Sequence, residues 1–174
     1  MNSSMNGAMI TPEYCRMMAR YNRWQNNSLR AAAATLDDAA READRGAFFG
    51  SVRATFSHLL WADTIWMSRL DGWTAPGMAI ATSGQFAPDW PSVTALRGRA
   101  DDRIIAWSER MHVVSGTVAW FSGALRREVK RPLALCIVHL FNHQTHHRGQ
   151  IHAMLTAAGA QPGDTDLFIL PEDV

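Results

Sequence analysis

The spacing of apolar residues along the chain predicts four long helices. Apolar side chains that recur every three or four positions gather on one face of a helix. The pattern holds in four segments, which are residues 12–36, 48–70, 92–111 and 132–158. No strands alternate with these segments, so we expect an all-α fold, an antiparallel four-helix bundle in a single domain spanning residues 1–174.

Residues at the ends of these segments carry local start and stop signals. Thr11, which precedes a proline, and Ser92 are typical of helix N-caps, whereas Asp71-Gly72 and Gly159 are typical of helix ends. Residues 1–10 are polar and are predicted to form a frayed N-terminus. The tail after Gly159 is short, and we expect residues 164–174 to pack back on the helices.

Two connections differ from ordinary short loops. Residues 73–91 hold three prolines and several aromatic residues, which is typical of a long ordered loop. This loop could shape a substrate pocket, or it could serve only packing within the bundle or a dimer; the sequence leaves both open. Residues 116–131 alternate around Ser122-Gly123, which predicts a small hairpin before the last helix.

Composition and charge exclude several classes of protein. Seventeen Lys and Arg stand against sixteen Asp and Glu, and no basic stripe follows a helix, so nucleic acid is not an expected partner. No targeting segment is visible at the start, and no apolar run approaches the length of about 18 residues that a membrane span needs. We therefore expect a cytoplasmic protein without membrane contact, and two distant cysteines, Cys15 and Cys136, that stay reduced.

Histidines are concentrated in the last predicted helix. Five of the seven fall between positions 139 and 152, and His139, His143 and His147 are spaced four apart. Residues at that spacing share one helix face, and imidazole is the commonest transition-metal ligand. Three histidines at this spacing are expected by chance in only about one of a hundred sequences of this composition. The pattern predicts a metal site, to which Cys136 is a weak additional candidate because free cysteine is usually a small buried hydrophobe.

One helix cannot surround a metal ion, so a further ligand should come from another helix. His58 lies midway along the second segment among small and apolar residues, which places it on an inward face. The alternative for His58 is a hydrogen-bonded core histidine. Gln144 occupies the position of the general base in the outline of a His-Glu-x-x-His motif, and glutamine cannot accept a proton from water, so a zinc peptidase is not expected.

The two histidine blocks carry a resemblance to a known family. Residues 49–66 and 139–150, together with Tyr21-Asn22-Arg23-Trp24, resemble the DinB-like (damage-inducible, YfiT-like) metalloprotein family over nearly the whole chain. The resemblance implies an antiparallel four-helix bundle with a long crossover, often dimeric, that binds zinc, nickel or a similar divalent ion. Mapped onto this sequence, it implies that His58, His143 and His147 are the metal ligands. It moves His139 to a supporting role, and His146 is expected to have a supporting role as well, because one ion cannot use every histidine and neighbouring side chains often orient the ligands.

Other polar residues are expected to have supporting or surface roles. Gln150, Asn142, Thr145 and, more weakly, Asp63 are candidates to orient the ligand imidazoles, because metal-bound histidines usually donate their second nitrogen to a partner. His152 points away from the cluster and is expected to be exposed. Five charged residues should form the exposed face of the third helix, namely Arg97, Arg99, Asp101, Asp102 and Arg103.

Arg148 lies on the far side of the last helix from His139. We expect a surface or interface charge there, paired with a tail acid such as Asp164 or Asp166.

The resemblance leaves the reaction open. It implies a metal-dependent transferase or isomerase that uses a low-molecular-weight thiol, such as mycothiol, bacillithiol or glutathione, and a small-molecule substrate. From the residues, a bound ion with open positions would activate water or a thiol, as a transferase or a hydrolase needs. The alternative is a non-catalytic metal-binding or stress-response protein with a structural ion, and a third reading is a metal-free bundle.

Overall fold

The computed structural model describes residues 9–123 and 125–173. Its four long helices are α1 (Pro12–Ala34), α3 (Val52–Leu70), α4 (Trp90–Glu109) and α5 (Leu133–Ala157). Shorter elements are α2 (Asp38–Glu42), the 3-10 helices η1 (Ile80–Gln85) and η2 (Leu167–Ile169), and the strands β1 (Thr117–Ser122) and β2 (Arg127–Pro132). A mostly helical chain with a small hairpin before the last helix is confirmed.

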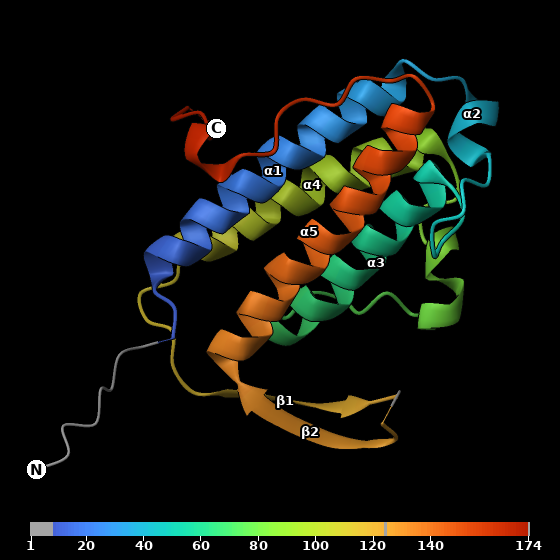
Figure 1. Cartoon of the computed structure of the whole chain (residues 1–174). Helices are drawn as coiled ribbons and strands as arrows, with labels where there is room; N and C mark the ends of the chain where they lie inside the picture. Colours follow the sequence, from blue (N-terminus) through green and yellow to red (C-terminus); the bar gives the residue numbers. More distant parts are fainter. Residues whose placement is uncertain (1–8, 124, 174) are drawn as a thin grey trace, which may run out of the picture.

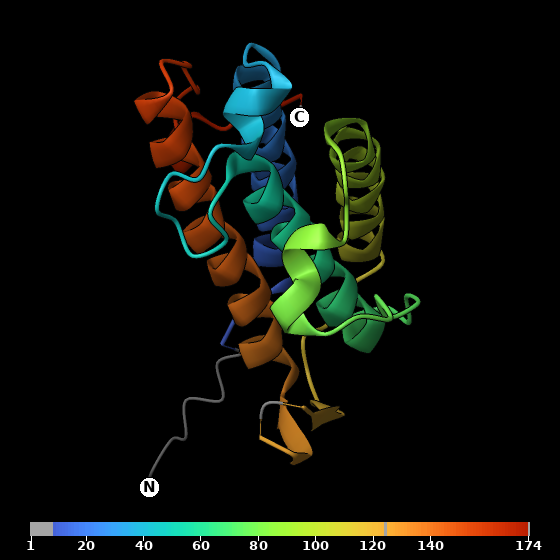
Figure 2. The same ribbon diagram turned by 90° about the vertical axis from the view of Figure 1, so that its right-hand side faces the viewer.

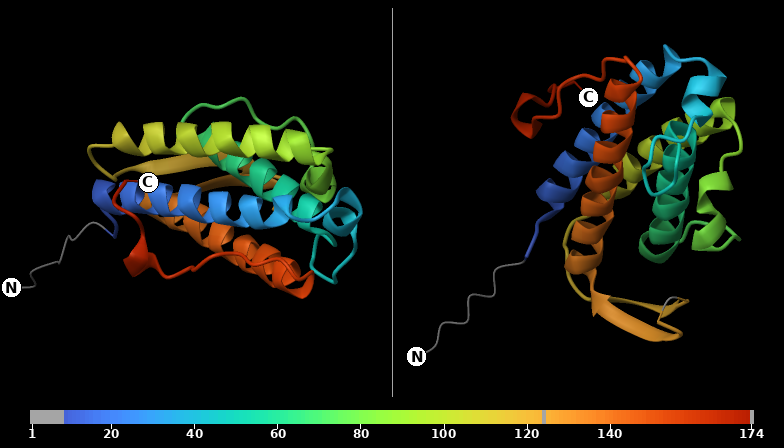
Figure 3. Two further views of the ribbon diagram at one scale, coloured as in Figure 1. Left: turned by 90° about the horizontal axis from the view of Figure 1, so that it is seen from above. Right: turned by 45° about the vertical axis from the view of Figure 1, so that its right-hand side comes forward.

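The four long helices pack side by side along one length of the molecule (Figures 1 and 2). Helix α1 packs against α4 and α5, and α3 packs against the same two helices from the other side. The connection between α3 and α4 returns the chain to the end of the molecule at which α3 begins (Figure 3). Helices α3 and α4 therefore run in the same direction, and α1 and α5 run opposite to them.

The helix starts follow from capping side chains. Thr11 accepts a hydrogen bond from the backbone N–H of Tyr14, as predicted. Helix α3 begins at Val52 rather than at residue 48, because the Ser51 hydroxyl caps it after Gly50, whose φ of 76° breaks the helix. The Ser92 prediction was wrong: Asp89 is the N-cap of α4, and its carboxylate accepts from the Ser92 N–H at 2.8 Å.

The predictions for the two ends of the chain have different outcomes. Of the segment predicted to be frayed, residues 1–8 lie outside the described residues, whereas Ile10 packs into the core. The tail does pack back: the Tyr21 hydroxyl donates to the carbonyl of Thr165 at 2.6 Å, and Gln25 Nε2 donates to the carbonyl of Asp164 at 2.8 Å. The tail therefore covers the side of α1.

The core contains charges that the sequence pattern placed on the surface. Arg97 and Asp101 are buried, whereas Arg99, Asp102 and Arg103 are exposed. Arg97 donates to Asp63 of α3 at 2.5 Å and lies 2.9 Å from Asp101. The prediction failed for Arg97 and Asp101 because a run of charges on one helix does not reveal a buried carboxylate on its neighbour.

None of the helices in residues 9–123 and 125–173 is long and apolar enough to cross a membrane.

Candidate metal centre

Three histidines from two helices converge on one point. His58 lies on α3, and His143 and His147 lie one turn apart on α5. One ring nitrogen from each lies within 4.8 Å of the other two. The Nε2 atoms of His58 and His143 are 3.4 Å apart. Packing of α3 against α5 brings His58 to the pair that the four-residue spacing had already placed on one face.

The spacing of the ring nitrogens fits a metal ion. Zinc binds imidazole nitrogen at about 2.0–2.1 Å, so two nitrogens at a tetrahedral site lie about 3.3 Å apart. The distance of 3.4 Å between His58 and His143 agrees with this value. The third imidazole, that of His147, has a ring nitrogen within 4.8 Å of the other two. In the described part of the chain, this is the one group of three or more His, Cys, Asp or Glu side chains close enough to hold an ion.

Ser83 determines the tautomer of His58. Its hydroxyl oxygen lies 2.8 Å from His58 Nδ1, and the hydroxyl hydrogen is donated to the carbonyl of Ile80 at 2.6 Å. A serine hydroxyl has one hydrogen, so the oxygen must accept from Nδ1–H of His58. The lone pair of the ring is then on Nε2, the atom that faces His143.

Gln150 does the same for His147, as the sequence predicted for a supporting residue. Its side-chain oxygen lies 2.7 Å from His147 Nδ1. An amide oxygen only accepts, so Nδ1 carries the hydrogen and Nε2 keeps its lone pair. Two of the three imidazoles are thus oriented by neutral acceptors behind them, the arrangement that metal-binding histidines usually have.

The environment lowers the pKa of all three rings, which favours their neutral forms. Burial, with repulsion from His147 and His143, lowers the pKa of His58 to about 3. Burial and the neighbouring His147 lower the pKa of His143 to about 3 as well, and burial also lowers the pKa of His147. A metal ion binds the deprotonated ring, so this environment prepares the group for a cation rather than for protons.

Aromatic side chains line one side of the histidines. The ring of Phe49 stacks on His58 with centroids 3.8 Å apart, and Trp61 stacks more distantly at 6.0 Å. Phe48, next to Phe49, is 83% exposed. Sequence reasoning did not single out Ser83 or Phe49 as site residues; both reach His58 from outside its own helix.

The remaining histidines lie outside the group of three. His139 is exposed and packs on Trp66, with its ring centroid 5.8 Å from that of His143. His146 is exposed beside His147. His152 is half-buried rather than exposed, and lies on a different face of α5. Cys136 is buried and does not belong to the group.

Three residues considered near the site belong to the core instead. Asp63 accepts hydrogen bonds from Gln144 and Arg97, so it does not orient an imidazole. Gln144 is fully buried, which places it away from the position of a catalytic base. The surface prediction for Arg148 was wrong: the side chain is buried and donates to Asn22 rather than to a tail acid. Asn22 on α1 and Gln144 and Thr145 on α5 are its neutral acceptors.

Nearly the whole chain matches one known protein family. The model described as the DinB family matches residues 1–172. The chain belongs to the DinB family. No curated protein matches it in sequence. DinB proteins are a metal-binding family, and here the three histidines of α3 and α5 form a group that fits a metal ion.

Proposed function

We propose that this DinB-family protein is a metalloenzyme in which His58, His143 and His147 hold one divalent ion, zinc or nickel. The observation that carries the proposal is the convergence of three imidazoles into a group that, among the described residues, includes no fourth His, Cys, Asp or Glu. Three protein ligands with an open position are the usual arrangement of a catalytic site, whereas structural sites are closed by a fourth.

The proposed reaction is transfer involving a low-molecular-weight thiol, with a small molecule as the second substrate. When bound, the ion would lower the pKa of a thiol or water at its open position. Ser83 and Gln150 hold the imidazoles in the tautomers that present Nε2. Phe49 and Trp61 offer an apolar wall against which the organic part of a substrate can pack. A hydrolase would use the same open position for water.

A non-catalytic role for the ion is the second candidate. His58 is only 2% exposed, and a bound ion would link α3 to α5. In that case the ion braces the bundle and its coordination is completed without an exchangeable ligand. This reading predicts a strong gain in thermal stability with metal and no response of the metal to thiols.

The proposal also covers the arrangement of the helices, the assembly of the protein and its location in the cell. We infer a DinB/YfiT-type four-helix bundle with a long crossover, in a cytoplasmic homodimer that binds neither nucleic acid nor membranes. Support comes from the family match and the packing of α1, α3, α4 and α5. Light scattering of the untagged protein tests the dimer.

X-ray absorption at the zinc edge distinguishes the two roles of the ion. In zinc-loaded, untagged protein we expect only light-atom ligands at about 2.0–2.1 Å, and addition of glutathione should bring in one sulfur at about 2.3 Å. The Cys136→Ser variant is the control, because it should give the same spectra. A spectrum that glutathione leaves unchanged would contradict a thiol-dependent enzyme and favour the structural ion.

A further inference from the structure

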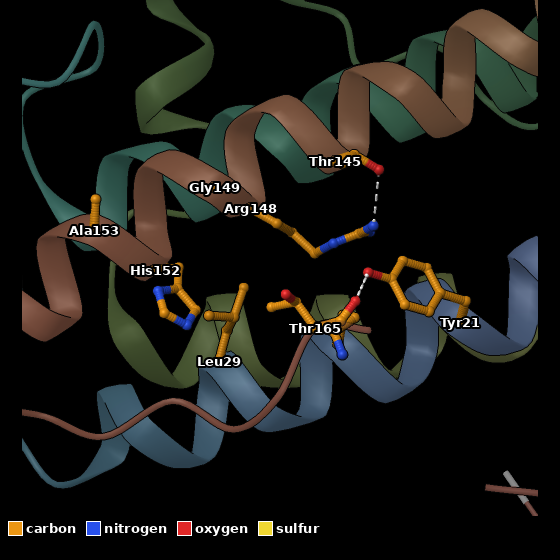
Figure 4. A pocket seen from close by; sticks show the side chains of 9 residues that line it. Tyr21, Leu29, Thr145, Arg148, Gly149, His152, Ala153 and Thr165 are labelled. Atoms are coloured by element: carbon orange, nitrogen blue, oxygen red, sulfur yellow. Dashed lines mark hydrogen bonds between the residues drawn. The ribbon is translucent and has the colours of Figure 1, made fainter. Parts of the chain in front are cut away.

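A cavity of about 500 Å³ lies between α1, α5 and the C-terminal tail. Figure 4 shows the side chains that line it. The residues that α5 contributes are Thr145, Arg148, Gly149, His152 and Ala153. They form a stripe at helical spacing that differs from the stripe of His143 and His147, so the cavity and these two histidines occupy different faces of α5.

Arg148 is the charged group of this cavity. Its side chain is 5% exposed, and it extends from α5 toward α1 between Thr145 and Tyr21 (Figure 4). Its hydrogen-bond partners are Asn22, Gln144 and Thr145, all of them neutral acceptors. Burial lowers the pKa of Arg148 to about 10, so the guanidinium stays charged at physiological pH. Asp63 and Asp101 attract the guanidinium at longer range, but its direct hydrogen bonds go to neutral groups, so it can still bind an anion through the donors that face the cavity.

Arg148 also has donors to spare. A guanidinium carries five N–H groups. Within the described chain, two hydrogen bonds leave from Nη1 and one leaves from Nη2. The Nε–H group and a second hydrogen on Nη2 remain, and a carboxylate accepts from this edge with its two oxygens.

The rest of the wall suits an organic anion. None of the residues that line the cavity is acidic. The tail carbonyls of Thr165 and Asp164 already accept hydrogen bonds, from the Tyr21 hydroxyl and from Gln25 Nε2. They therefore repel an anion less than free carbonyls would. Leu29 and Ala153 form an apolar portion of the wall, and His152 adds an imidazole. The cavity is thus cationic on one side and apolar on another.

We propose that this cavity binds a small organic monocarboxylate, with its carboxylate on Arg148 and its apolar body against Leu29 and Ala153. A monoanion is favoured over a phosphate dianion because one fixed cation lines the cavity. The site is separate from the metal centre, so its occupancy does not depend on a metal ion.

Binding of benzoate to the full-length protein, followed by backbone amide NMR shifts, tests the proposal. Benzyl alcohol serves as the neutral probe of similar shape. We expect benzoate to give saturable shifts centred on Leu29, Gly149 and Ala153, with an affinity at least tenfold above that of benzyl alcohol. Removal of metal with a chelator should leave the benzoate affinity unchanged.

A variant that fills the cavity provides the second arm. A Cβ at Gly149 would meet no atom within 4 Å apart from its chain neighbours and the helix backbone, so the side chain of Gly149→Leu has room at the cavity. We expect it to weaken benzoate at least tenfold, whereas Asn142→Leu, at an exposed position of α5 outside the cavity, should have no effect. Equal affinity for the alcohol, shifts centred on the three histidines, tighter binding of inorganic phosphate in the cavity, or unchanged affinity in Gly149→Leu would overturn the proposal.

Discussion

The hydroxyl oxygen of Ser83 lies 2.8 Å from Nδ1 of His58, and this contact makes the connection between α3 and α4 part of the candidate metal centre. The connection is held firmly to α3. Ser57 donates to the carbonyl of Ser83 and accepts from the N–H of Ala87, and Arg53 donates to the carbonyl of Gly84. Contacts between α3 and this connection therefore determine where Ser83 lies and how His58 is oriented. The connection is distant in sequence from α5, the helix that carries most of the histidines.

Replacement of Ser83 by alanine should weaken metal binding. His58 would lose the acceptor that selects its tautomer, and loss of such a partner typically lowers metal affinity about 10–100-fold. Competition with a zinc-binding dye measures the affinity. Thr82→Ala is the matched control, because Thr82 is an exposed neighbour on η1 whose hydroxyl donates to the carbonyl of Ala79 and not to a histidine among the described residues. Equal affinity in Ser83→Ala and wild type would contradict the orienting role.

Gln150 allows a graded test of the same principle on His147. Gln150→Leu removes the acceptor and should lower zinc affinity about tenfold or more. Gln150→Glu keeps an acceptor and makes the ring a stronger ligand, so its affinity should equal or exceed that of wild type. Thr156→Ala is the control for general effects of a substitution on α5, because Thr156 is exposed and lies outside the group of three histidines. If Gln150→Leu and Gln150→Glu bind zinc equally, Gln150 has no orienting role.

The buried charges should contribute strongly to stability through their pairing. Arg97→Met leaves Asp63 and Asp101 buried without their cation, which should lower the free energy of unfolding by about 3–5 kcal/mol. Urea denaturation measures the loss. Arg99→Met, at an exposed position of α4, should change stability by about 0.5 kcal/mol or less. If Arg97→Met lowers the free energy of unfolding no more than Arg99→Met does, burial of the two carboxylates does not depend on Arg97.

The metal-free protein should lose stability as pH falls below 6.5. The pKa of His58 and of His143 is lowered from 6.5 to about 3, so the unfolded chain binds more protons than the folded one between these values. Stability is fully present above pH 6.5 and falls toward pH 3, by about 1.4 kcal/mol per pH unit for each histidine. Urea denaturation of wild type and of His58→Asn/His143→Asn over this pH range measures the difference. If the free energy of unfolding falls with pH equally steeply in the double variant, His58 and His143 are not the cause of the loss.

Relationships between neighbours in the sequence predict much of the helical pattern and two of the three histidines in the group. Helix caps such as Thr11 depend on neighbours in sequence, and the spacing of His143 and His147 puts them on one face before any packing is known. The inward position of His58 could also be inferred from the small residues around it. The preference for His143 and His147 over His139 came from the family resemblance rather than from spacing.

The remainder depends on contacts between distant segments. Ser83 reaches His58 through the path of an irregular loop, and no helical period describes such a path. Arg97 and Arg148 were predicted at the surface because charge usually lies there, but Asp63 and Asn22 on other helices provide buried partners. Asp89 replaced Ser92 as the cap of α4 because Pro91 is compatible with the first turn of a helix.

The central claim is that His58, His143 and His147 hold one divalent ion. Elemental analysis of untagged protein, purified in parallel as wild type and as His143→Ala, tests it most directly. The account predicts about one equivalent of zinc or nickel per wild-type chain and less than about a tenth of an equivalent in the variant, because a site reduced to two imidazoles loses most of its affinity. Equal metal content in the two proteins, or no metal in wild type even after incubation with zinc and with nickel, would contradict it.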